Sequence, residues 1–162
     1  MIKVDLANEQ SKHDIDADLL CRAVRTVLEG EQIRSGIVSL AVVDDPTIHK
    51  LNRKYLAHDY PTDVLSFRLS DADTPLEAEV IVSADTASAR SADFGWQMLD
   101  ELLLYVIHGM LHLAGYDDKA VSDRMIMREK EEQYLRLLGR PLPTPERSAI
   151  SGEQAFKGGS SA

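Results

Sequence analysis

His108, His112 and Asp118 lie within the run HGMLHLAGYDD, and their two imidazoles and one carboxylate are side chains that bind Zn²⁺. Residues four apart on an α-helix share a face, so the two histidines can point toward one metal ion. Gly115 gives the backbone a place to leave the helix and to bring Asp118 back as a third ligand. Three protein ligands with one position left for water are typical of a catalytic zinc, whereas a structural zinc usually has four. The run therefore predicts a catalytic metal site.

The alternative interpretation needs no metal. A histidine in an apolar helix is more often a core residue with a hydrogen-bond partner, and Asp118 precedes another helical stretch that it could cap. Two histidines on one stripe of an otherwise apolar helix, however, need polar partners if they are buried. We therefore prefer the metal site.

The elements that must position these residues follow from the hydrophobic pattern. Strands are expected at 2–6, 36–44, 64–69 and 79–83, and helices at 16–29, from Asp45 (the N-cap) onward, at 84–94 with Ser83 as N-cap, at 98–114 and at 121–138. About four strands and about five helices predict a small mixed sheet in an α+β or α/β domain.

The last two helices differ in character. The helix at 98–114, which carries the histidines, has no polar face and should be buried from several sides. The helix at 121–138 is amphipathic, and we expect a solvated face formed by Arg128, Glu129, Lys130, Glu131 and Glu132.

Composition limits the class of protein. The 162 residues, 44% hydrophobic and 28% charged, are those of an ordinary globular domain, which we place at residues 1–139, followed by a disordered tail at 140–162 rich in Pro, Ser and Gly. No apolar run reaches the roughly twenty residues of a membrane span, and the first residues lack the pattern of a signal peptide. We expect a cytoplasmic protein without a membrane partner. The single cysteine, Cys21, is expected to pack in the core.

The formal net charge of −9 argues against indiscriminate binding to nucleic acid. A polyanionic substrate would have to meet a confined basic patch, and Arg53 and Arg68 flank a possible functional loop.

These motifs together resemble the YbeY family of bacterial metal-dependent endoribonucleases. The resemblance covers roughly residues 40–139 and depends on three segments: LNRKYLAHDYPTDVLSF (51–67), EVIVS (79–83) and HGMLHLAGYDD (108–118). It implies a zinc enzyme with a zincin-like metal helix that cuts single-stranded RNA. It further implies a role with the small ribosomal subunit, in maturation of the 3′ end of 16S ribosomal RNA and in ribosome quality control. DNA is not an expected partner.

Two residues depart from the family pattern. Asp118 stands where the family usually has a third histidine, and its charge should make the bound water a weaker acid and Mn²⁺ or Fe²⁺ better competitors for the site. Leu56 stands where many members have an arginine that is thought to engage the RNA phosphate. His58, Arg53 and Arg68 are the candidates to replace it, and His58 is the one candidate for a further catalytic group.

The resulting hypothesis is that the metal polarises a phosphodiester oxygen or supplies hydroxide for attack. Asp117 is a candidate to orient a ligand or to form the turn. The alternative of a zinc protease is not favoured, because the HExxH motif has a glutamate where this chain has Gly109. Two further alternatives are a zinc hydrolase of another substrate class and a ribosome-associated binding protein whose metal is structural.

Overall fold

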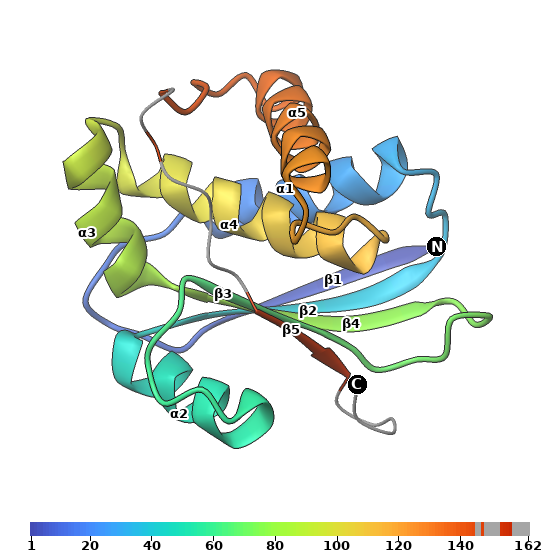
Figure 1. Cartoon of the computed structure of the whole chain (residues 1–162), viewed down its shortest axis with the longest axis horizontal. Coiled ribbons are helices and arrows are strands. Elements are labelled where there is room, and N and C mark those ends of the chain that lie inside the picture. Colours follow the sequence, from blue (N-terminus) through green and yellow to red (C-terminus); the bar gives the residue numbers. More distant parts are fainter. Residues whose placement is uncertain (145–146, 148–152, 157–162) are drawn as a thin grey trace.

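A mixed β-sheet forms the middle layer of the fold in the computed structural model, which describes residues 1–144, 147 and 153–156 (Figure 1). Across the sheet the strands run in the order β1 (Ile2–Asn8), β2 (Gly36–Val43), β4 (Leu76–Ser83), β3 (Val64–Arg68) and β5 (Glu153–Phe156). The first three are parallel, β3 is antiparallel to β4, and β5 is parallel to β3.

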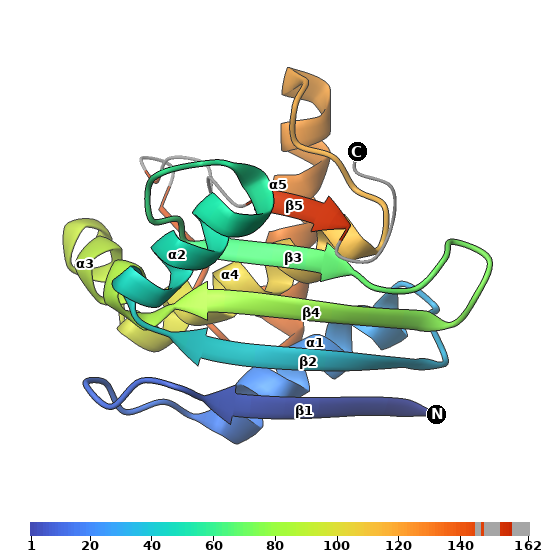
Figure 2. The same ribbon diagram turned by 90° about the horizontal axis from the view of Figure 1, so that it is seen from below.

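The two faces of the sheet are covered unequally. The helices α1 (Ala17–Gly30), α3 (Ala84–Phe94), α4 (Met98–Leu113) and α5 (Val121–Leu137) lie on one side, and α2 (Asp45–Leu56) lies on the other, in front of the sheet in Figure 2. The larger apolar cluster is formed by the sheet with α1, α4 and α5. A smaller one beneath α2 contains Val43, Ile48, Leu65, Phe67 and Ile81. The α+β class, the small mixed sheet and the five helices of the described chain confirm the fold predicted from the sequence.

Side chains at the helix starts explain several of the boundaries. The Asp16 carboxylate accepts from the Leu19 amide at 3.1 Å, and the Ser83 hydroxyl accepts from the Thr86 amide at 3.2 Å. The prediction of Asp45 as the N-cap of α2 was wrong by one residue. Asp44 is the cap, and the Asp45 carboxylate accepts instead from the hydroxyls of Ser83 and Thr86.

Helix α4 is the central element of the helical layer. All of its residues from Asp100 to Leu113 are buried, as its lack of a polar face predicted. It lies so close to the sheet that a Cβ atom on Gly109 would be 3.2 Å from side-chain carbons of both Val64 and Val80. The sheet therefore sets the position of the helix that carries both histidines.

The described residues of the C-terminal segment contact the domain, whereas the rest of the tail expected at 140–162 lies outside the described residues. Arg147 is buried, and its guanidinium forms two hydrogen bonds of 2.7 and 2.8 Å with the Glu101 carboxylate. The backbone of β5 pairs with β3 and so extends the sheet by a strand that no hydrophobic pattern had indicated. None of the helices in the described part of the chain has the length and apolar character needed to span a bilayer.

Candidate metal centre

The side chains of His108, His112 and Asp118 converge at the C-terminal end of α4. The two Nε2 atoms are 3.0 Å apart, and Asp118 Oδ2 lies 3.3 Å from each of them. The histidine side chains are almost completely buried, whereas a quarter of the Asp118 side chain is exposed. The group is therefore reachable from solvent on the aspartate side.

Local backbone geometry brings the three residues together. The histidines lie one helical turn apart, and α4 ends at Leu113. Gly115 then adopts a φ of 109°, a conformation that side-chain-bearing residues rarely take, and the chain turns back toward the helix. The Asp117 carboxylate accepts from the Asp118 amide at 2.7 Å, so Asp117 holds the backbone of the third ligand rather than an imidazole.

The second nitrogen of each imidazole faces an oxygen atom of the protein. His108 Nδ1 lies 2.7 Å from a carboxylate oxygen of Glu131 on α5, and His112 Nδ1 lies 3.0 Å from the backbone carbonyl oxygen of Tyr116. An Nδ1–H donated to these acceptors leaves the lone pair of each Nε2 directed at the common point.

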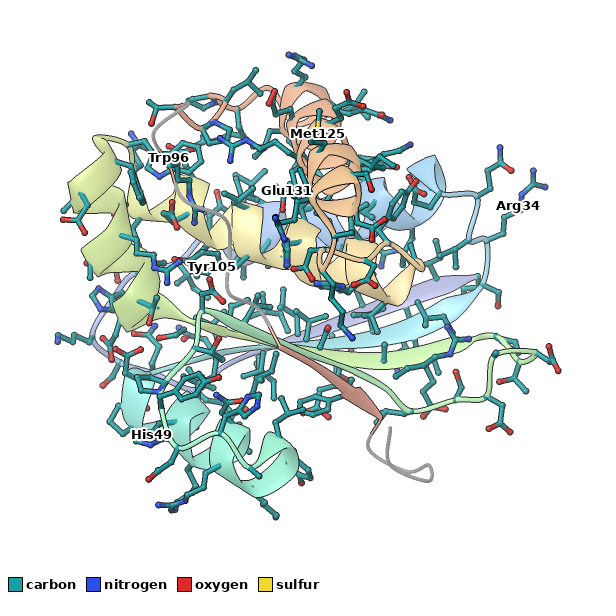
Figure 3. The ribbon with its side chains drawn as sticks, viewed as in Figure 1. Arg34, His49, Trp96, Tyr105, Met125 and Glu131 are labelled. Carbon is teal, nitrogen blue, oxygen red and sulfur yellow. The ribbon has the colours of Figure 1, made fainter. Side chains whose placement is uncertain are left out.

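Glu131 is the residue that sequence reasoning missed. It was assigned to the solvated face of its helix, but it is buried, and Figure 3 shows it where α5 crosses α4. The signal was present in the helical spacing, because Glu131 is four residues after Met127 and four before Leu135, both of which are buried.

The acids around the histidines control their protonation. Burial by itself lowers the pKa of His108, but Asp118 and Glu131 outweigh it and raise that pKa to about 9. Burial, followed by the charge of His108, lowers the pKa of His112. His108, whose Nε2 atom lies 3.3 Å from the carboxylate, is the main cause of a lowered pKa for Asp118. A proton and a divalent cation thus compete for the same pair of nitrogens.

The geometry of the three atoms fits a tetrahedral metal. Zinc with ligand bonds of about 2.0–2.2 Å keeps neighbouring ligand atoms about 3.3 Å apart. The three separations here are 3.0, 3.3 and 3.3 Å. Two neutral imidazole nitrogens and one carboxylate oxygen also form a donor set that Zn²⁺ accepts, with a fourth position left on the exposed side.

A second network fixes the turn that follows the histidines. The Tyr116 hydroxyl donates to Glu31 at the end of α1 at 2.8 Å, and the Tyr134 hydroxyl of α5 donates to the same carboxylate. Lys130 forms an ion pair with Glu31 at 3.5 Å. Tyr116, whose backbone carbonyl orients His112, is therefore connected through its side chain and Glu31 to α1 and α5.

The other candidate residues lie elsewhere. Arg53 is on α2, on the opposite side of the sheet, where it forms a 3.8 Å ion pair with Asp59, and His58 follows this helix and stacks on Tyr60. Arg68 donates to the backbone carbonyls of the loop between β3 and β4. None of the three is among the described residues that line the cavity beside the ligand cluster. That these three residues contact RNA stays a prediction, and any such contact would be made away from the ligand cluster.

Gly109 explains why the helix has no HExxH glutamate. Its Cα faces Val64 and Val80 of the sheet, and even a methyl group there would be in tight contact. A glutamate at this position would point into the apolar core and away from the ligands. This packing argues against the protease alternative.

Comparison with known proteins provides an independent test. The model of the family described as Endoribonuclease YbeY matches residues 5–139. The chain belongs to the YbeY endoribonuclease family. Endoribonuclease YbeY of Salinibacter ruber is 37% identical over 150 residues, covering 88% of this chain and 94% of that protein. The protein of the same name from Carboxydothermus hydrogenoformans is 40% identical over 139 residues, covering 83% and 96%.

A solved structure supports the same conclusion. The solution structure of TM1509 from Thermotoga maritima is similar to this chain with a TM-score of 0.59 and 30% sequence identity, covering 85% of this chain and 89% of that one. Membership of the YbeY family confirms the enzyme class predicted from the sequence, a nuclease that acts on phosphodiester bonds. It also agrees with a metal-binding role for the histidine and aspartate cluster.

Proposed function

We propose that this chain is a Zn²⁺-dependent endoribonuclease that cuts single-stranded RNA at the centre formed by His108, His112 and Asp118. Its substrate would be the RNA of the small ribosomal subunit, in maturation of the 3′ end of 16S ribosomal RNA and in ribosome quality control in the cytoplasm. Residues 1–139 would form the functional domain. Family membership and the convergence of three ligand atoms within 4.8 Å of one another support this proposal.

The convergence of the two Nε2 atoms is the observation that carries the proposal. Glu131 and the Tyr116 carbonyl orient the imidazoles before any ion binds, so little rearrangement is needed. Asp118 adds a negative charge that offsets part of the charge of a divalent cation. When bound, such an ion supplies Lewis-acid chemistry, because it withdraws electrons from a phosphodiester oxygen and makes water more acidic.

The partial exposure of Asp118 supports a catalytic rather than a structural metal. A structural zinc closes its shell with four protein ligands. Among the described residues only three such groups meet here, and the cluster opens on a cavity. The alternative of a ribosome-associated protein with a structural metal would require binding to the small subunit without metal-dependent cleavage.

The substitution His112→Ala tests the proposal. It should abolish both stoichiometric zinc, measured by elemental analysis, and cleavage of single-stranded ribosomal RNA precursors. The control is His49→Ala, because His49 is a partly exposed histidine on α2, across the sheet from the cluster, and pairs with the exposed Asp59 (Figure 3). RNA cleavage that persists in His112→Ala at the wild-type rate would refute the assignment.

A further inference from the structure

The ligand cluster opens on a cavity of about 410 Å³ beside the first turns of α5. His108 and Asp118 of the ligand cluster line it, and α5 contributes a wall that contains Val121, Arg124, Met125 and Arg128. Cavities of about 300–1,000 Å³ accommodate ligands of small-molecule size, which includes one nucleotide. The cavity is therefore large enough for a group attached to the phosphate that reacts at the metal.

Arg124 places its positively charged guanidinium next to the ligand cluster. Its Nη1 atom donates to the backbone carbonyl of Lys119 at 2.7 Å and lies 3.5 Å from that of Asp118, which fixes the guanidinium beside the ligand loop. Arg124 is exposed and lines the cavity, and among the described residues no acceptor pairs with its Nε or Nη2 atoms. Arg128 is engaged differently, because it donates to the backbone carbonyls of Thr144 and Arg147.

The charge of this wall contrasts with that of the whole chain, which is −9. Asp118, Glu129 and Glu131 also line the cavity, but Asp118 and Glu131 face the histidine pair, where a divalent cation would offset their charges. The remaining charged residues among the described ones that line the cavity are then two arginines, Arg124 and Arg128, and one acid, Glu129. A phosphate group would meet a local positive potential.

The same wall offers an apolar surface. Val121 is 66% exposed and Met125 is 63% exposed, although both are apolar residues in the first two turns of a helix. An unstacked nucleobase has an apolar face that packs on such side chains.

We propose that this cavity is a nucleotide subsite of the proposed endoribonuclease, in which Arg124 binds a phosphate next to the scissile one and Val121 with Met125 contacts the attached base. The inference rests on the proposed function. In this chain, which has Leu56 where many family members have an arginine, Arg124 would make the contact with the RNA phosphate. The substrate class is a single strand with at least one unstacked base beside the cleavage site.

The test measures binding and cleavage separately, on the full chain loaded with Zn²⁺. Arg124→Ala should weaken the binding of phosphorothioate-linked single-stranded RNA about tenfold. Fluorescence anisotropy measures this binding. The substitution should also reduce the slope of log K against log salt concentration by about 0.7, the value for one phosphate contact in a single strand. Met125→Ala should weaken binding of the single strand but leave binding of duplex RNA unchanged, because paired bases cannot enter the cavity.

Arg136→Ala and Leu137→Ala are the matched controls, since both residues are exposed in the last turn of the same helix and neither lines the cavity. The controls should bind RNA as the wild type does, and zinc content should be equal in all five proteins. Equal binding by Arg124→Ala and Arg136→Ala would overturn the subsite, as would a wild-type chain that does not bind RNA. Tight, Arg124-dependent binding without any cleavage would instead support the subsite and refute the proposed endoribonuclease activity.

Discussion

The two imidazoles reach one point because an oxygen atom of the protein holds the far nitrogen of each. Glu131 does this for His108 through a side chain, and Tyr116 does it for His112 through a backbone carbonyl. A backbone acceptor is present whatever the residue type, whereas the carboxylate depends on the residue at position 131. A substitution at Glu131 therefore tests how much the orientation of the His108 imidazole contributes to metal affinity.

The substitution Glu131→Gln should weaken zinc binding about 10- to 100-fold, the effect usual for loss of a carboxylate that supports a histidine ligand. The amide keeps the shape of the side chain but lacks the charge that favours the Nδ1–H tautomer of His108. Competition against a chromophoric chelator measures this affinity without reference to catalysis.

Glu132→Gln is the control, because it removes the same charge from the next residue of α5. Zinc affinity in that variant should equal the wild-type value. An unchanged affinity in Glu131→Gln would show that the 2.7 Å contact with His108 does not contribute to ligand orientation.

Among the elements, α4 and the sheet are in close contact at Gly109. Val64 and Val80 are fully buried on β3 and β4, and their branched side chains occupy the space next to Gly109. Glycine within a helix normally costs about 1 kcal/mol relative to alanine. Here it allows the helix to approach the sheet, and the same approach places His108, the residue before it, and His112 in the following turn.

Gly109→Ala should consequently lower the free energy of unfolding, by about 1–2 kcal/mol, because the cost of overpacking exceeds the gain in helix propensity. Urea denaturation monitored by circular dichroism measures the change. Ala89→Gly, at an exposed position of α3, gives the propensity difference in this chain without a packing change. A midpoint for Gly109→Ala above that of the wild type would contradict the packing argument.

For the molecule as a whole, one buried ion pair connects the C-terminal segment to the central helix. The side chains of Glu101 and Arg147 are almost wholly inaccessible, and the Trp96 indole donates to the same carboxylate at 2.9 Å. Burial alone would raise the pKa of Glu101, but the hydrogen bonds and charge of Arg147, together with the hydrogen bond from Trp96, lower it below its ordinary value of 4.5. The pair therefore stabilises the fold above pH 4.5, and this contribution is lost as pH falls through the lowered pKa.

Arg147→Met should reduce the free energy of unfolding by about 3 kcal/mol at pH 7, because it leaves an uncompensated buried carboxylate. The difference from the wild type should shrink as pH falls, because without Arg147 the burial of Glu101 raises its pKa and the variant protonates this carboxyl at a higher pH than the wild type does. Urea midpoints at several pH values measure both effects. The double variant Glu101→Gln with Arg147→Met should recover part of the loss, and a pH-independent difference would contradict the assignment of the effect to Glu101.

The local features of this fold could be predicted from the sequence alone, because residues close in the chain determine them. Two histidines one helical turn apart, a glycine after the helix and the following aspartate predicted a cluster that the structure shows, and Ser83 was identified as a helix cap. The residues around that cluster depend on contacts between distant segments. Glu131 meets His108 across 23 residues, and Arg147 meets Glu101 across 46.

Such contacts follow from how helices cross and how the chain returns to the sheet edge, which hydrophobic periodicity does not specify. Glu131 looked solvated because four charged neighbours surround it in sequence, although α5 turns that one position inward. Nothing in the sequence indicated the role proposed for Arg124 for the same reason, since its place beside Asp118 arises only when the turn after α4 brings the start of α5 against the His108, His112 and Asp118 cluster. The cluster of His108, His112 and Asp118 was thus encoded locally, and the groups that orient its side chains and line its cavity were set by packing of α4 between α5 and the sheet.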